Sequence, residues 1–89
     1  MIRAALVALL LSGCAVLQTE RERCGYLLDA AWEELDASKA DGFAGTVSYG
    51  KAAALVAHGK LQQTLERFPS CIEAAERARF YIKESRAGR

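Results

Sequence analysis

Helical spacing of apolar residues is the feature that most restricts the fold of this chain. Stretches at about residues 17–38, 47–67 and 71–85 repeat apolar side chains at helical intervals, and no segment sustains the alternation typical of a strand. Glycine-rich residues 41–45 and Phe68-Pro69-Ser70 separate the stretches. Because short connections make successive helices antiparallel neighbours, the pattern predicts an all-α fold. We expect a small antiparallel three-helix bundle, or a helical hairpin with a third helix packed on it.

Each predicted helix has an apolar face that we expect to be buried. The face of the first helix consists of Leu17, Cys24, Leu28, Ala31, Trp32 and Leu35. The face of the second consists of Val47, Ala54, Leu55, Leu61 and Leu65, with Lys51 and His58 on the same side. The face of the third consists of Cys71, Ala75, Ala78 and Ile82. The sequence from Ser70 to Glu73 is typical of a capping box and predicts the start of the third helix.

Residues 1–13 have the pattern of a cleaved leader. Arg3 supplies a positive charge, residues 4–11 form a short apolar run, and the small residues Ser12 and Gly13 follow. The run is far shorter than the ~20 residues that a membrane-spanning helix needs. The motif Leu11-Ser12-Gly13-Cys14 resembles the lipobox of bacterial lipoproteins at all four positions. This resemblance implies cleavage before Cys14, a lipid on its sulfur, and a single helical domain at residues 14–89.

The same resemblance gives an expected location in the bacterial cell envelope. Ala15, rather than aspartate, follows the lipidated cysteine. By the sorting rules of such lipoproteins, this implies the inner leaflet of the outer membrane, facing the periplasm. Each buried lipid methylene contributes ~0.8 kcal/mol, so two or more acyl chains would hold the protein stably on the membrane.

Two cysteines remain once Cys14 is assigned to lipidation. Of the 89 residues, 76 remain after the 13-residue leader is removed, and so short a chain often needs a covalent staple. Cys24 and Cys71 both lie on predicted apolar faces, and the periplasm is oxidising, so we expect them to form a disulfide. One alternative stays open: Cys71 is near a helix start, where a free thiol would be reactive. We expect no metal site, because His58 is the only histidine and no zinc-like spacing accompanies it.

Composition and motifs limit the possible functions. The chain has 12 basic and 11 acidic residues, a balance that argues against nucleic-acid binding. No catalytic motif is present, so we expect neither an enzyme nor a cofactor. The carboxyl-terminal end carries one candidate contact surface, for anionic lipid headgroups or an acidic partner, or else a solvated helix end. Its residues are Arg79, Phe80, Lys83 and Arg86.

The remainder of the chain also resembles a family. Trp32-Glu33-Glu34-Leu35, residues 42–49 and residues 78–86 make it similar to the small helical lipoproteins of pseudomonads and their relatives. This resemblance implies an envelope location and supplies no catalytic residues. We therefore expect a non-enzymatic binding or assembly module, held by its lipid and contacting an envelope protein. The alternatives are a redox or enzyme-accessory lipoprotein that uses Cys71, and a lipoprotein that perturbs membranes.

Overall fold

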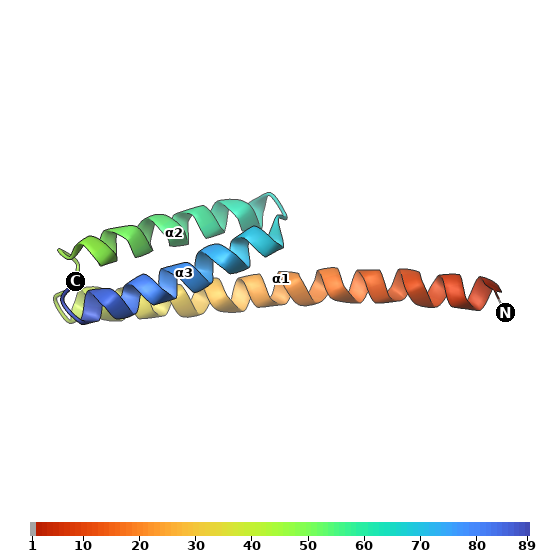
Figure 1. Ribbon diagram of the computed structural model, residues 1–89, viewed down its shortest axis with the longest axis horizontal. Helices are drawn as coiled ribbons and strands as arrows, with labels where there is room; N and C mark the ends of the chain where they lie inside the picture. The colour runs from red at the N-terminus through yellow and green to blue at the C-terminus, as the bar shows by residue number, and fades with distance from the viewer. Residues whose placement is uncertain (1) are drawn as a thin grey trace.

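The protein is a bundle of three helices joined by two short turns. The computed structural model describes the backbone of residues 2–89 and the side chains of residues 18–89. The helices are α1 (Ile2–Ala40), α2 (Val47–Thr64) and α3 (Phe68–Arg86), and residues 2–89 contain no strand. Helix α2 runs antiparallel to both α1 and α3, which are parallel to each other (Figure 1). The predicted all-α three-helix fold is confirmed, whereas the side chains of the predicted leader, of Cys14 and of Leu17 lie outside the description.

The two turns have different local causes. After α1, Gly42 adopts a φ of 94°, which favours glycine, and Thr46 Oγ1 then accepts the Tyr49 N–H at 3.2 Å to cap α2. The predicted capping box at Ser70 is wrong, because α3 already begins at Phe68 and has no side-chain cap. Pro69 in the first turn explains this earlier start, since proline has a helix-compatible φ and its missing N–H is not needed there.

The buried faces of α1 and α3 match in register along their whole contact. On α1 the buried residues are Cys24, Leu27, Leu28, Ala31, Leu35 and Ser38. On α3 they are Phe68 and a series of six residues, each 47 positions after its α1 counterpart: Cys71, Ala74, Ala75, Ala78, Ile82 and Ser85. The constant offset means that the two parallel helices face each other position by position. A disulfide joins the first pair of this series, and a hydrogen bond joins the last.

The buried serine pair at the far end was not predicted from the sequence. The hydroxyls of Ser38 and Ser85 are 2.7 Å apart, and both residues are fully buried. Because Ser85 Oγ donates to the Ile82 carbonyl at 2.6 Å, Ser38 is the donor in the pair. Both polar groups are therefore satisfied, which removes the cost of burying them.

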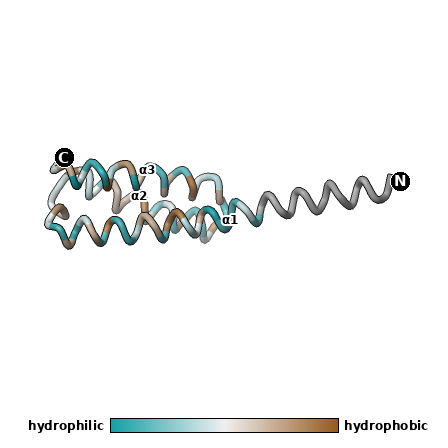
Figure 2. The backbone as a smooth tube through the Cα atoms, turned by 90° about the horizontal axis from the view of Figure 1, so that it is seen from below, coloured by the Kyte–Doolittle hydropathy of each residue, from teal (hydrophilic) through white to brown (hydrophobic). Residues whose placement is uncertain are grey.

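The predicted buried face of α2 is wrong. Val47, Leu61 and Leu65 are 70%, 53% and 50% exposed, Ala54 is exposed as well, and Leu55 is half-buried. Helix α2 instead buries Ser48, Ala52, Val56, Gly59 and Gln62. Trp32 of α1 was also predicted to be buried and is 47% exposed. Figure 2 shows how closely hydrophobic and hydrophilic residues intermix along the three helices, so apolar character alone did not single out one face of α2.

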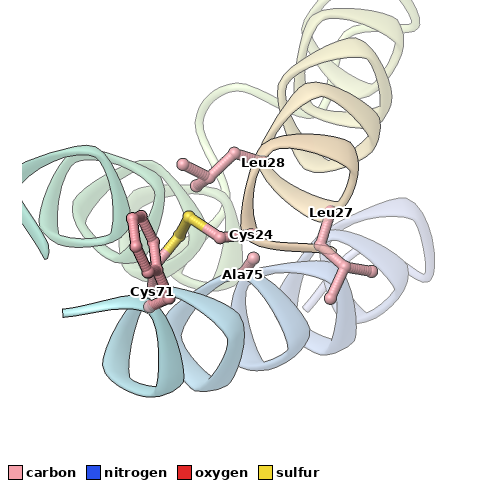
Figure 3. Packing of buried hydrophobic residues seen from close by; sticks show 6 residues of the cluster. Cys24, Leu27, Leu28, Cys71 and Ala75 are labelled. Carbon is pink, nitrogen blue, oxygen red and sulfur yellow. A yellow bond between two sulfur atoms is a disulfide. The ribbon is translucent and has the colours of Figure 1, made fainter. Parts of the chain in front are cut away.

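Gly59 explains which side of α2 meets the bundle. A Cβ atom built on Gly59 would lie only 2.7 Å from Leu28 Cδ2 and 3.6 Å from Ala74 Cβ. The absence of a side chain therefore lets α2 approach both α1 and α3 at this point. Leu28 occupies the space beside the disulfide (Figure 3). A close contact with a small residue, rather than the largest apolar stripe, sets the rotation of α2 about its axis.

Candidate functional site

The two cysteines meet at the end of the bundle where α3 begins. Cys24 and Cys71 form a disulfide with a Cα–Cα distance of 5.6 Å, and both are 0% exposed. Leu27, Leu28, Phe68 and Ala75 complete this cluster (Figure 3). The pairing predicted from the sequence is present. A position near a helix start activates a thiol only when that thiol is free and accessible, and Cys71 is neither.

The predicted basic contact surface is largely paired within the molecule. Arg79 donates to both carboxylate oxygens of Glu34 at 2.7–3.1 Å, joining α3 to α1. Arg86 donates to Asp41 at 2.6 Å. The hydrogen bonds that Arg79 donates to Glu34, and next the negative charge of Glu34, raise the pKa of Arg79 above its ordinary value. Because two of its three cations have carboxylate partners, this end presents much less positive charge than the sequence suggested.

The remaining members of that surface stay accessible. Phe80 and Lys83 are exposed, and with Glu76 and Arg79 they line a shallow hollow on α3. The Phe80 ring contacts Tyr81 edge-on, with the ring centroids 5.3 Å apart. All four predicted contact residues therefore lie on one helix, but the arginines are held toward α1 and the turn that follows it.

The Glu34–Arg79 pair should contribute more to stability than the exposed Arg23–Glu76 pair. The first makes three charge-assisted hydrogen bonds between half-exposed side chains, and the second makes one at 3.0 Å between more exposed ones. In double-mutant cycles with glutamine, we expect a coupling of about 1 kcal/mol for Glu34 and Arg79, and about 0.3 kcal/mol for Arg23 and Glu76. Urea denaturation would measure both. Equal couplings would contradict a structural role for the bidentate pair.

Among the described side chains, the titratable groups outside the ion pairs include one histidine, His58, beside α3. His58, Ser70, Glu73 and Arg77 line a small hollow between α2 and α3. Among residues 18–89, His58 makes no hydrogen bond to Ser70 or Glu73. Over the same residues, no group of three histidine, cysteine or acidic side chains is placed to hold a metal ion. His58 is exposed, contrary to its predicted position on a buried face.

The surface that sequence reasoning missed is the outward side of α2. Six exposed residues there are apolar or glycine, and we call them the outer face of α2. They are Val47, Gly50, Ala54, Ala57, Leu61 and Leu65. The helical periodicity of this stripe predicts a buried face, whereas the structure places the stripe on the surface.

Within the described residues, no helix is long and apolar enough to cross a membrane.

These features define a class: a small all-α three-helix bundle with one buried disulfide between its parallel helices. No protein-family model, curated protein or solved structure matches the chain. The arguments on function therefore rest on the residues and their geometry.

Proposed function

We propose that this protein is a lipid-anchored envelope protein that acts as a non-enzymatic binding or assembly module. The observation that carries the proposal is the order of its parts: a lipobox at Leu11–Cys14 comes ten residues before Cys24, which opens a disulfide-linked bundle. The lipid on Cys14 would hold the bundle at the outer membrane, on its periplasmic side. A buried disulfide supports an oxidising compartment of this kind.

The surface of the bundle supports binding rather than catalysis. Two hollows among the described residues are lined by charged side chains that include the paired Arg79 and the surface residues Glu73 and Arg77. The outer face of α2 exposes Val47, Leu61 and Leu65, and a row of exposed apolar side chains is typical of a contact surface. The redox alternative requires a reactive Cys71, and the burial and pairing of that residue argue against it.

The Cys14→Ser variant tests the anchor. We expect the wild-type protein to begin at a modified Cys14 and to fractionate with membranes, because the acylated cysteine supplies the membrane affinity. The variant should stay unprocessed or become soluble. Intact-mass spectrometry of the mature protein, with fractionation of the envelope, measures both properties.

The Cys71→Ser variant is the matched control, because it removes a sulfur and leaves the lipobox unchanged. It should retain the lipid even though its bundle is less stable. A wild-type amino terminus at any residue other than a modified Cys14 would contradict the proposal. If the amino terminus is a modified Cys14, crosslinking in intact envelopes, followed by purification, would identify the protein partner of the anchored bundle.

A further inference from the structure

The outer face of α2 combines apolar side chains with an absence of negative charge. Helix α2 contains no aspartate or glutamate, and its charged residues are Lys51 and Lys60. By contrast, the described part of α1 exposes Asp29, Glu33 and Asp36. The exposed face of α2 is therefore apolar with cationic edges, and the nearest acidic residues on α1 are Asp29 and Asp36, one helical turn on either side of Trp32.

Each long edge of this face carries a lysine and an aromatic ring. Lys51 Nζ lies 5.3 Å from the centroid of the Tyr81 ring of α3, and Lys60 Nζ lies 4.7 Å from the centroid of the Trp32 ring of α1. Lys51 therefore lies where α2 meets α3, and Lys60 lies where α2 meets α1. Aromatic rings and lysine ammonium groups beside an apolar strip are the arrangement favoured at a membrane–water interface.

We propose that the outer face of α2 lies against an anionic phospholipid surface, the membrane that holds the Cys14 lipid. This inference rests on the proposed function. An apolar helix face with cationic flanks inserts at the headgroup boundary, where phosphate groups attract the lysines. A protein already anchored to that membrane needs only a weak second contact, because docking is then intramolecular.

The anchored end of the chain is placed to allow this contact. The Arg21–Glu66 ion pair, at 3.3 Å, and the Cys24–Cys71 disulfide bring the end of α2 beside the part of α1 that follows the anchor. Cys14 precedes Cys24 by ten residues, a segment that spans about 15 Å as a helix and about 33 Å when extended. As part of α1 this segment runs along the bundle axis, so the sideways reach depends on the extended length. A segment that unwinds before Cys24 is long enough to cross the ~10 Å diameter of a helix and bring the anchor to the bilayer beneath α2.

A second copy of the chain fits this face less well. Two outer faces packed together would bring lysine edges of like charge near each other, without a carboxylate from either α2. One helix face also offers less area than the ~800 Å² per partner that a stable interface of standard size buries. A lipid surface satisfies both the apolar strip and the lysines.

Trp32, the only tryptophan of the chain, reports directly on the proposed contact. The lipidated full-length protein would be reconstituted in vesicles of phosphatidylcholine with phosphatidylglycerol, and attachment would be verified by flotation. We expect brominated phospholipids to quench Trp32 emission. The double variant Leu61→Gln/Leu65→Gln should reduce the ratio of docked to undocked protein roughly tenfold, because it removes two apolar side chains from the contact. Tyr26→Gln, a matched change of an exposed aromatic residue on α1, should leave quenching unchanged.

The outcomes separate this inference from the proposed function. Failure of the wild-type protein to float would contradict the lipid anchor. Flotation with unquenched Trp32, or equal loss of quenching in the Tyr26 variant, would overturn the docking of α2 and leave the anchor intact. In vesicles of pure phosphatidylcholine, the ratio of docked to undocked protein should fall about fivefold for each lysine that no longer interacts with an anionic headgroup. Equal quenching in both lipids would refute the anionic preference, and quenching that disappears as crosslinked dimers form would assign the face to a second copy.

Discussion

Reduction of the Cys24–Cys71 disulfide is expected to lower the free energy of unfolding by about 4 kcal/mol, since the bond closes a long loop in the unfolded chain. The two cysteines are 47 residues apart. Breaking the bond restores the conformational freedom of that segment to the unfolded state. Because a domain of this size has only ~5 kcal/mol or somewhat more of stability, this loss would remove most of it.

Serine variants give a sharper test of the disulfide. Cys24→Ser, Cys71→Ser and the double variant should lose similar stability, because the second substitution removes a bond that the first has already broken. Each serine also places a hydroxyl at a fully buried position, with a cost of ~1–3 kcal/mol if it stays unpaired. Urea denaturation with and without reductant measures these losses.

Reductant should lower the free energy of unfolding of the wild-type protein. It should leave that of the three serine variants nearly unchanged, because they have no disulfide to reduce. Additive losses in the double variant would show that the sulfurs act separately. Two free thiols in protein isolated from the periplasm would also refute the pairing, and would favour the redox alternative for Cys71.

The Gly59→Val substitution is expected to destabilise the bundle by about 1–3 kcal/mol, the usual cost of overpacking a core. The nearest atom to the added Cβ would be Leu28 Cδ2, at 2.7 Å. Leu28 is 2% exposed and lies in the cluster around the disulfide, so it has little room to move away. Relief of the clash requires either a change of the Leu28 rotamer within this packed cluster or a shift of α2 away from α1, and both would weaken packing contacts.

The same substitution at Gly50 is the matched control on α2. A Cβ on Gly50 would meet no atom within 4 Å, and valine has a slightly better helix propensity than glycine. Gly50→Val should therefore change the free energy of unfolding by no more than about 0.5 kcal/mol. Thermal unfolding followed by circular dichroism compares the two variants. Equal melting temperatures would show that α2 does not pack closely at Gly59.

The sequence was most informative where large or chemically distinct residues mark a helix face. The stripes of α1 and α3 were predicted from Cys24, Leu28, Cys71 and Ile82, all of which are buried. The pairing of Cys24 with Cys71 was predicted from their positions on these two faces and from the oxidising compartment that the lipobox resemblance implies. The resemblance to a lipobox rests on four consecutive residues, Leu11 to Cys14, and the lipidation that it implies remains a prediction.

The carboxyl-terminal contact surface shows a different limit of sequence reasoning. Arg79 and Arg86 formed a basic cluster in the sequence because their partners, Glu34 and Asp41, are each 45 positions away. Only the parallel packing of α1 and α3 brings those carboxylates within hydrogen-bond distance. Charge counted along one helix therefore overestimated the charge that this surface presents.

The sequence by itself determined that the chain forms three helices, where the first turn lies, and most of the residues that α1 and α3 bury, because helical periodicity and turn residues act locally. The second turn lies at residues 65–67, just before the predicted Phe68-Pro69-Ser70. The tertiary structure alone decided the orientation of α2. Alanine and glycine make several sides of that helix almost equally apolar, so its buried side depends on which one fits against Leu28 and Ala74. Gly59 provides that fit, and the larger residues Leu61 and Leu65 are left facing outward.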